Sequence, residues 1–215
     1  MEAQSEVPET GVHPLDPTDP AQLEAFAELH ELTLPESVPV RFGRRFMTGF
    51  YFPKLVEDGL AAGDLFRCDG RWAGYNWYTK VPHTMLRDAV RRHLWFLCGF
   101  MPGVLLANPR ILLAVPKMLH NQGGFPDQPR TGYFLTFGVH PDFRGRDVDG
   151  KRIGTHLMER MFDYFRDAGF EAVEATVERQ NERAVAFYRR CGFEVLERGF
   201  ESGAQLQVRY EFAPR

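Results

Sequence analysis

The sequence predicts an α/β (α+β) fold in which a central sheet is flanked by helices. The main observation is the order of elements between residues 132 and 193: a strand, a loop rich in glycine and arginine, a helix, a second strand and a second helix. The second observation is the pair Asp69-Gly70 between two β-rich runs, which is a strong hairpin signal. The third is a hydrophobic fraction of 44%, which is ample for a core. Together these features are typical of one α/β domain.

The domain boundaries follow from length and composition. We expect residues 1–10 to be disordered, because they are acidic and lack the apolar segment of a signal peptide. We expect residues 11–215 to form a single domain with a helical insertion at 81–130. The net charge of −3 argues against a nucleic-acid partner. The three cysteines have no metal-ligand spacing, which predicts no metal site and suits a reducing cytoplasm.

The N-terminal part predicts one short strand and two helices. The strand is expected at 12–15, and a helix at 21–31 begins with Asp19 as its N-cap and Pro20 in its first turn. A second helix is expected at 41–56. Its apolar residues recur at helical spacing and are interpreted as core: Phe42, Phe46, Phe50 and Leu55.

A long connection follows the hairpin strands expected at 62–68 and 72–78. It extends from residue 79 to residue 131, and its sequence predicts helices at 84–98 and 109–120. The run 94–107 is strongly apolar, but it is shorter than the roughly 20 residues that span a bilayer, and Pro102 is expected to interrupt it. A transmembrane helix is therefore rejected.

Three interpretations of this insertion remain open. It can be a helical hairpin that packs on the domain, or a surface through which two copies of the chain form a homodimer. It can also be an apolar lid over a substrate or a contact with a membrane surface. Arg87, Arg91, Arg92 and His93 precede the apolar run, and such charges are most often a solvated face.

The C-terminal half predicts the core of the sheet. Its elements are a strand at 133–139, a helix at 153–168, a strand at 170–177, a helix at 181–190 and final strands at 193–198 and 206–212. Gly169 and Gly192 are expected to cap the two helices, and Gly203 marks the last turn. The glycine-rich loop before the helix at 153 is an anion site, because the amides of a first helical turn are unpaired and the helix dipole is positive there.

Two motifs in this half carry a family resemblance. The first is V-H-P-D-F-R-G at 139–145, followed by G-K-R-I-G-T at 150–155. The second is N-x-x-A-x-x-F-Y-x-x-x-G-F at 181–193. This pattern, which covers roughly residues 130–200, resembles the GNAT superfamily of acetyl-CoA-dependent N-acyltransferases. The resemblance implies the GNAT fold, a central mixed sheet of six to seven strands flanked by helices, with a helical insertion before the central strand.

The resemblance implies acetyl-CoA as acyl donor and a set of residues that bind it. The strand at 133–139 is expected to diverge from its neighbour near a bulge at Gly138 and to pair with the pantetheine arm. Two alignments of the diphosphate loop compete: an insertion after Arg144-Gly145, which we prefer, or a motif at 149–154. The implied binding residues are Phe137, Gly138, Val139, Arg144, Gly145, Gly150, Lys151, Arg152, Ile153, Gly154, Thr155 and Asn181.

The resemblance also implies a proton donor. Tyr188 occupies the position at which the family motif places a tyrosine beside the thioester sulfur, and a phenol is protonated at neutral pH. The general base stays open among Glu178, His140, Glu36 and a water relay. Glu178 is the candidate selected, because it ends the strand nearest the expected thioester. Asn181 is either the N-cap of its helix, a contact to the cofactor, or both.

Three functions compete at this point. The preferred one is N-acetylation of a primary amine by acetyl-CoA, with a small molecule or an amino sugar as the acceptor. The second is a non-catalytic CoA-binding regulatory module on the same fold. The third is a membrane-surface or oligomeric scaffold organised by residues 94–119. The apolar insertion weakly favours a small-molecule or cell-surface acceptor over a protein tail.

Overall fold

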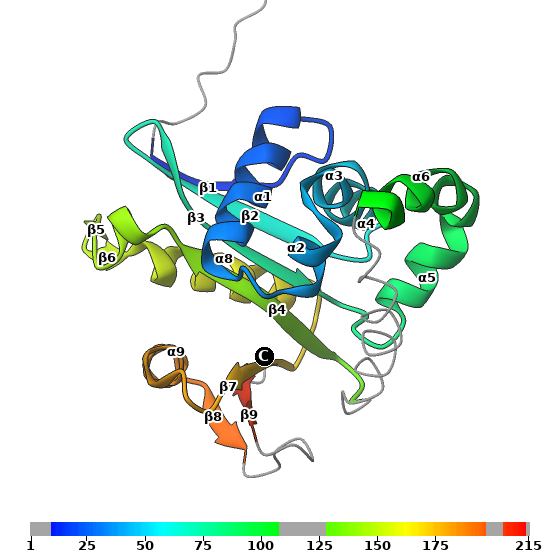
Figure 1. The fold of residues 1–215 in the computed structure, drawn as a ribbon. Coiled ribbons are helices and arrows are strands. Elements are labelled where there is room, and N and C mark those ends of the chain that lie inside the picture. Colours follow the sequence, from blue (N-terminus) through cyan, green and yellow to red (C-terminus); the bar gives the residue numbers. More distant parts are fainter. Residues whose placement is uncertain (1–9, 108–127, 197–203, 214–215) are drawn as a thin grey trace, which may run out of the picture.

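A seven-stranded sheet forms the centre of the computed structural model, which describes residues 10–107, 128–196 and 204–213 (Figure 1). Its strand order is β1-β2-β3-β4-β7-β9-β8. The strands are β1 Gly11–Pro14, β2 Ala62–Cys68, β3 Arg71–Thr79, β4 Thr131–Val139, β7 Ala172–Glu178, β8 Glu194–Leu196 and β9 Gln205–Glu211. Within this sheet β4 and β7 pair in parallel and the other neighbours are antiparallel. The expectation of a mixed six- to seven-stranded sheet is confirmed.

The hairpin between β2 and β3 turns at Asp69 and Gly70. Both residues have positive φ angles, 49° and 75°, as a two-residue hairpin turn that matches the strand twist requires. The sequence prediction for this turn is confirmed, and the two strands that it joins are largely buried.

Helix α1, Pro20–Thr33, covers one face of the sheet. Asp19 is its N-cap, since one carboxylate oxygen accepts hydrogen bonds from the amides of Ala21 and Gln22 at 2.8 and 3.3 Å. Pro20 lies in the first turn, where its missing N–H costs no helical hydrogen bond. Both sequence predictions are confirmed. Buried side chains of α1 such as Phe26 pack on Tyr75 and Trp77 of β3.

The prediction of one continuous helix at 41–56 is wrong. The segment consists of α2 Val38–Phe42, α3 Arg44–Phe46, a π-helical turn Met47–Tyr51 and α4 Phe52–Glu57. Gly43, with a φ of 90°, separates the first two pieces. The apolar positions are nevertheless buried as predicted, in the cluster that α1 also joins. The apolar spacing therefore identified the core correctly, although the backbone turn at Gly43 divides the helix.

The insertion begins with α5 Met85–Arg92 and α6 Leu94–Ala107. One helix was expected at 84–98, but the chain divides at His93. Pro102 does not interrupt the second helix as expected. Helix α6 continues through it, since the φ angle of proline is compatible with a helix although the residue donates no helical hydrogen bond. The helix expected at 109–120 lies outside the described residues. In the described ranges every helix is too short or too polar to cross a lipid bilayer.

Two helices cover the other face of the sheet. These are α8 Ile153–Asp167 and α9 Glu182–Arg190, and Gly169 follows the first of them with a φ of 75°. The inner face of α8 is buried as predicted, at Ile153, Leu157, Met161 and Phe165. Gly192, with a φ of 89°, follows α9. The order strand, loop, helix, strand, helix that the sequence predicted is therefore present.

Candidate functional site

The strands β4 and β7 pair over only part of their length. Their register extends from Thr131 opposite Ala172 to Phe134 opposite Ala175, and it stops there although both strands continue. Residues 136–139 keep their pairing with β3 on the other edge, and β7 pairs with β9 along its whole length. A gap therefore opens between the C-terminal halves of β4 and β7. The main-chain groups of 135–139 that face β7 are available to another molecule.

The bulge in β4 does not lie at Gly138, where the sequence analysis placed it. Gly138 is in regular register with Tyr75, and the irregularity falls beside Trp77 and Tyr78, where Leu135 is the unpaired residue. Gly138 is a glycine for another reason. A Cβ atom there would lie 2.5 Å from Thr33 Oγ1 and 2.6 Å from a ring carbon of Tyr75. The end of α1 thus packs directly on the backbone of β4 beside the gap.

The loop after β4 contains a small hairpin that separates its glycines. Gly145 has a φ of 83°, and β5 Asp147–Val148 then pairs with β6 Lys151–Arg152 across a turn at Asp149 and Gly150, whose φ angles are 52° and 79°. Arg144 and Gly145 are therefore set apart from α8 by a two-stranded insertion. This geometry supports the alignment in which the diphosphate loop is interrupted after Gly145.

The first turn of α8 has no side-chain cap. Its N-cap residue, Arg152, has a side chain that cannot accept a hydrogen bond, and the first residues of the helix are Ile153, Gly154 and Thr155. At Gly154 a Cβ atom would lie 2.9 Å from the ring of Phe137. That ring stacks on Phe187 of α9 at 5.0 Å. The glycine therefore lets the amide end of α8 approach β4 and α9, beside the gap.

The basic residues of the loop are spread over its surface. Arg144 donates to the carbonyl of Val139 at 3.2 Å, and Lys151 pairs with both carboxylate oxygens of Glu159 at 2.8 Å. Arg152 is exposed at the start of the helix. The three side chains lie close in sequence to the uncapped turn of α8, and a positive edge at a helix N-terminus favours an anionic ligand.

Tyr188 packs at the point where β4 and β7 part. Its ring makes edge contacts with Phe134, the last β4 residue paired with β7, and with Phe193. The side chain is 8% exposed, and burial raises the pKa of the phenol above its ordinary value of 10.0. Among the described residues no hydrogen bond occupies its hydroxyl. The phenol is therefore a protonated group beside the gap.

The remaining predicted residues lie in different parts of the fold, two of them at the end of β7. Asn181 is the N-cap of α9, since its side-chain oxygen accepts from the amide of Ala184 at 3.0 Å. Glu178 ends β7, and its side chain is exposed. Glu36 is exposed and pairs with Arg41, while His140 accepts from the amide of Asp142 at 3.2 Å. The structure therefore does not bring these three general-base candidates together.

Two further residues at the divergence were missed in the sequence. The hydroxyl groups of Tyr133 in β4 and Thr176 in β7 form a hydrogen bond, with their oxygens 3.0 Å apart. Burial and the neighbouring Tyr188 and Glu174 raise the pKa of Tyr133, whereas its hydrogen bond to Thr176 lowers it. A tyrosine and a threonine are ordinary strand residues, so only the pairing of the two strands reveals that they meet.

Comparison with known proteins finds similarity to acetyltransferases of the GNAT family. A model of the Acetyltransferase (GNAT) family matches residues 118–193. This match covers about a third of the chain, and both motifs that carry the resemblance lie within it. A mycothiol acetyltransferase of Rhodococcus jostii is 29% identical over 174 residues, or 79% of this chain and 50% of that protein. A mycothiol acetyltransferase of Propionibacterium freudenreichii is 39% identical over 69 residues, or 32% of this chain and 20% of that protein. The chain therefore spans half or less of these relatives' length.

Solved structures share the fold at low sequence identity. The PaiA N-acetyltransferase of Thermoplasma acidophilum, in complex with coenzyme A, has a TM-score of 0.54 at 11% identity and covers 94% of this chain and 99% of that one. An acetyltransferase of the GNAT family from Streptococcus pneumoniae has a TM-score of 0.53 at 15% identity, with 95% and 100% covered. These likenesses establish the GNAT fold that the sequence motifs implied.

Proposed function

We propose that the protein is an N-acetyltransferase that transfers an acetyl group from acetyl-CoA to a primary amine of a small molecule or an amino sugar. The observation that carries the proposal is the divergence of β4 from β7, with Tyr188 packed where the strands part. The family match and the names of the two mycothiol acetyltransferases support the reaction class. The solved relatives bound to coenzyme A support the donor.

The chain offers three sets of groups that fit this donor. Main-chain groups at Phe137, Gly138 and Val139 would bind the pantetheine amides, because β7 does not use them. The uncapped first turn of α8, with Gly154 and Thr155, would bind the diphosphate together with the loop. The loop residues proposed for this role are Arg144, Gly145, Gly150, Lys151, Arg152 and Ile153. Asn181 would add a contact while it caps α9.

Bound acetyl-CoA would supply the activated acetyl group as a thioester. Tyr188 holds a proton on its phenolic oxygen and would give it to the sulfur that leaves as the amine nitrogen takes the acetyl group. Glu178, at the exposed end of β7, is the proposed carboxylate that takes the proton from the amine nitrogen. Transfer of this proton through solvent to the phenolic oxygen then restores Tyr188.

The test compares Tyr188→Phe with Tyr210→Phe, which removes a hydroxyl from the same apolar cluster but on β9. We expect Tyr188→Phe to lower kcat by about 10²- to 10⁴-fold, the range for a lost general acid or base. The rise in melting temperature that acetyl-CoA causes should persist, because binding is linked to stability. Tyr210→Phe should keep both properties. Released thiol and thermal denaturation are the measurements.

Two outcomes would contradict the proposal in different ways. If millimolar acetyl-CoA leaves the melting temperature unchanged, the protein does not bind this donor. If acetyl-CoA raises the melting temperature but no amine in a broad panel releases CoA, the protein is a non-catalytic CoA-binding module. Unchanged turnover in Tyr188→Phe would remove the proton-donor role alone.

A further inference from the structure

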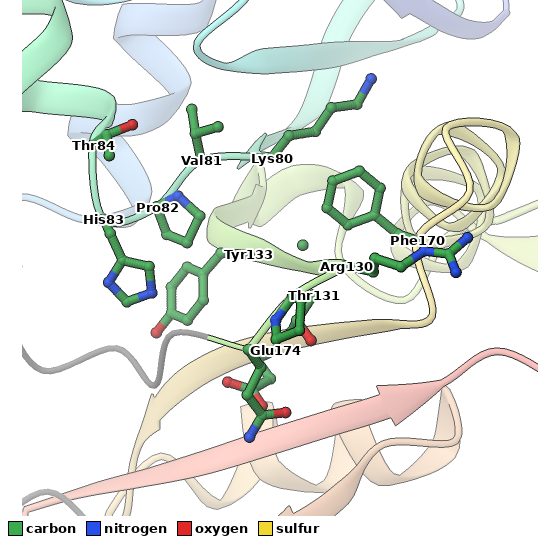
Figure 2. Close-up of a pocket in the computed structure, with 13 residues that line it drawn as sticks. Lys80, Val81, Pro82, His83, Thr84, Arg130, Thr131, Tyr133, Phe170 and Glu174 are labelled. Atoms are coloured by element: carbon green, nitrogen blue, oxygen red, sulfur yellow. The ribbon is translucent and has the colours of Figure 1, made fainter.

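A cavity of about 300 Å³ lies at the N-terminal end of β4, away from the loop at 144–152. The segment after β3, the start of β4, Phe170 and Glu174 line it. Figure 2 shows Pro82, His83 and the ring of Tyr133 on one side and Phe170 and Arg130 on the other, with Glu174 between them at the lower edge of the view. This volume is at the lower end of the range of about 300–1,000 Å³ for ligand pockets, so the cavity suits a small molecule.

Tyr133 connects this cavity to the gap between the strands. Its side chain lines the cavity, and its hydroxyl lies 3.0 Å from Thr176 Oγ1. Thr176 is the first residue of β7 beyond Ala175, where pairing with β4 ends. A small molecule in the cavity would therefore reach the end of the gap at which the acetyl group is expected. It would approach from the end of the sheet opposite to the diphosphate loop.

Glu174 gives the cavity its chemical preference. The side chain is 1% exposed, one carboxylate oxygen accepts from Arg209 at 2.7 Å, and the other accepts from Gln207 at 2.7 Å. A carboxylate offers about four acceptor positions, so these two partners leave room for another donor. Buried carboxylates favour hydrogen-bonded and cationic partners.

The basic residues around the cavity do not make it an anion site. The side chain of Lys80 extends away from the other labelled residues (Figure 2), and its amine lies 4.2 Å above the ring of Tyr164. Arg130 donates to the carbonyl of Gly169 at 3.1 Å and to Glu171 at 2.7 Å. Both cations are therefore engaged by other groups. Glu174 is engaged by Arg209 and Gln207, but these two bonds do not use all of the acceptor positions of its carboxylate.

We infer that this cavity binds the acceptor, a small primary ammonium compound, and that the Glu174 carboxylate and the Tyr133 hydroxyl hold its nitrogen. This inference rests on the proposed acetyltransferase function. Pro82 and Phe170 contact the apolar part of the acceptor, and the nitrogen points toward Thr176 and the gap. The ammonium group gives one proton to solvent water before its nitrogen bonds to the acetyl carbon, and the second proton leaves as the amide bond forms.

The first experiment measures binding without turnover. The ¹⁵N-labelled protein is titrated with ethanolamine, glucosamine and phenethylamine, each beside its analogue with a hydroxyl in place of the amine. We expect at least one amine to shift the amide signals of residues 131–133 and 174, and its uncharged analogue to leave them unchanged. If none of the amines shifts these signals, the cavity is not the acceptor site.

The second experiment uses variants and the same amines as substrates. Glu174→Gln should raise the KM for the amine by about tenfold or more, the loss expected for a charge-assisted hydrogen bond, and leave the acetyl-CoA thermal shift intact. Glu194→Gln, which removes an exposed carboxylate on β8 outside the cavity, is the matched control. A second variant, Val81→Trp, places a bulky side chain at the exposed edge of the cavity and should raise the KM more for phenethylamine than for ethanolamine. This variant tests the same cavity if Glu174→Gln does not fold.

The outcomes separate this inference from the proposed function. If CoA release and the acetyl-CoA thermal shift are intact but Glu174→Gln and Val81→Trp leave the amine KM unchanged, the cavity assignment is overturned and the acetyltransferase proposal stands. If the amines bind at 131–133 and 174 while acetyl-CoA causes no thermal shift, the donor is overturned and the cavity remains an ammonium site.

Discussion

His30 shows how a single polar side chain is accommodated beneath α1. It is fully buried, and its two ring nitrogens lie 3.1 Å from the Tyr75 hydroxyl and 2.9 Å from Ser37 Oγ. Burial lowers the pKa of the imidazole from 6.5 to about 4, against a smaller opposite effect of Glu31. The ring is therefore neutral at physiological pH, with one nitrogen as donor and the other as acceptor.

This shift predicts a dependence of stability on pH. The folded-state pKa of His30 is lowered, so the unfolded chain takes up a proton first as the pH falls. The stabilisation is present above pH 6.5 and is lost between pH 6.5 and about 4. Its magnitude is on the order of 3 kcal/mol. Urea unfolding of the wild type should lose more free energy over this interval than unfolding of His30→Gln, which does not titrate. Equal losses in the two proteins would contradict the assignment.

At the scale of elements, β4 combines two environments in one strand. Residues 131–134 pair with β7, and Tyr133 and Phe134 also pair with β3, whereas residues 136–139 pair with β3 alone. Leu135, Thr136 and Phe137 are half-buried, unlike the fully buried residues before them. The sequence of β4 is β-rich throughout, and nothing in its composition marks the point at which the second edge becomes free. That point depends on the path of β7 and α9.

Hydrogen exchange should detect this division of β4. Amides of 135–139 that face β7 should exchange faster in the free protein than the amides of 131–134, because they lack a strand partner. Addition of acetyl-CoA should slow their exchange together with that of the first turn of α8. Amides between β7 and β9 serve as the control, since these strands pair along their whole length. Exchange at 135–139 that does not respond to acetyl-CoA would contradict the proposed path of the pantetheine arm.

At the scale of the whole molecule, the sheet separates apolar clusters on its two faces. One cluster lies beneath α1 and α4 and contains Trp77, and another lies beneath α8 and α9 and contains Phe134. Residues of β3 alternate between them, since Trp77 faces one cluster and Tyr78 the other. Both clusters pack on the same strands, so loss of packing on one face of the sheet would destabilise the strands that support the other cluster.

This shared sheet predicts that the described domain unfolds as one unit. Urea unfolding should give a single transition that coincides when it is followed by tryptophan fluorescence and by far-UV circular dichroism. The variant Trp95→Phe removes an indole that is 87% exposed on α6, so the remaining fluorescence reports Trp72 and Trp77. Two separated transitions would show that the faces unfold independently and would contradict the single-domain expectation for residues 11–215.

The sequence by itself determined the order of the elements, the caps at Asp19 and Gly169, the turn at Asp69-Gly70 and the resemblance to the GNAT family. Each of these depends on contacts between residues that are close in the chain, and local spacing encodes such contacts. It also identified the buried positions of 41–56, but not the turn at Gly43 that divides the helix.

Only the tertiary structure decided which residues of the candidate site meet. The gap between β4 and β7, the meeting of Tyr133 with Thr176, and the buried Glu174 beside Arg209 all join segments far apart in the chain. The same is true of Gly138, which is a glycine because Thr33 and Tyr75 pack against it. Such contacts depend on how whole elements pack, and a local pattern cannot specify the partner of a residue many positions away.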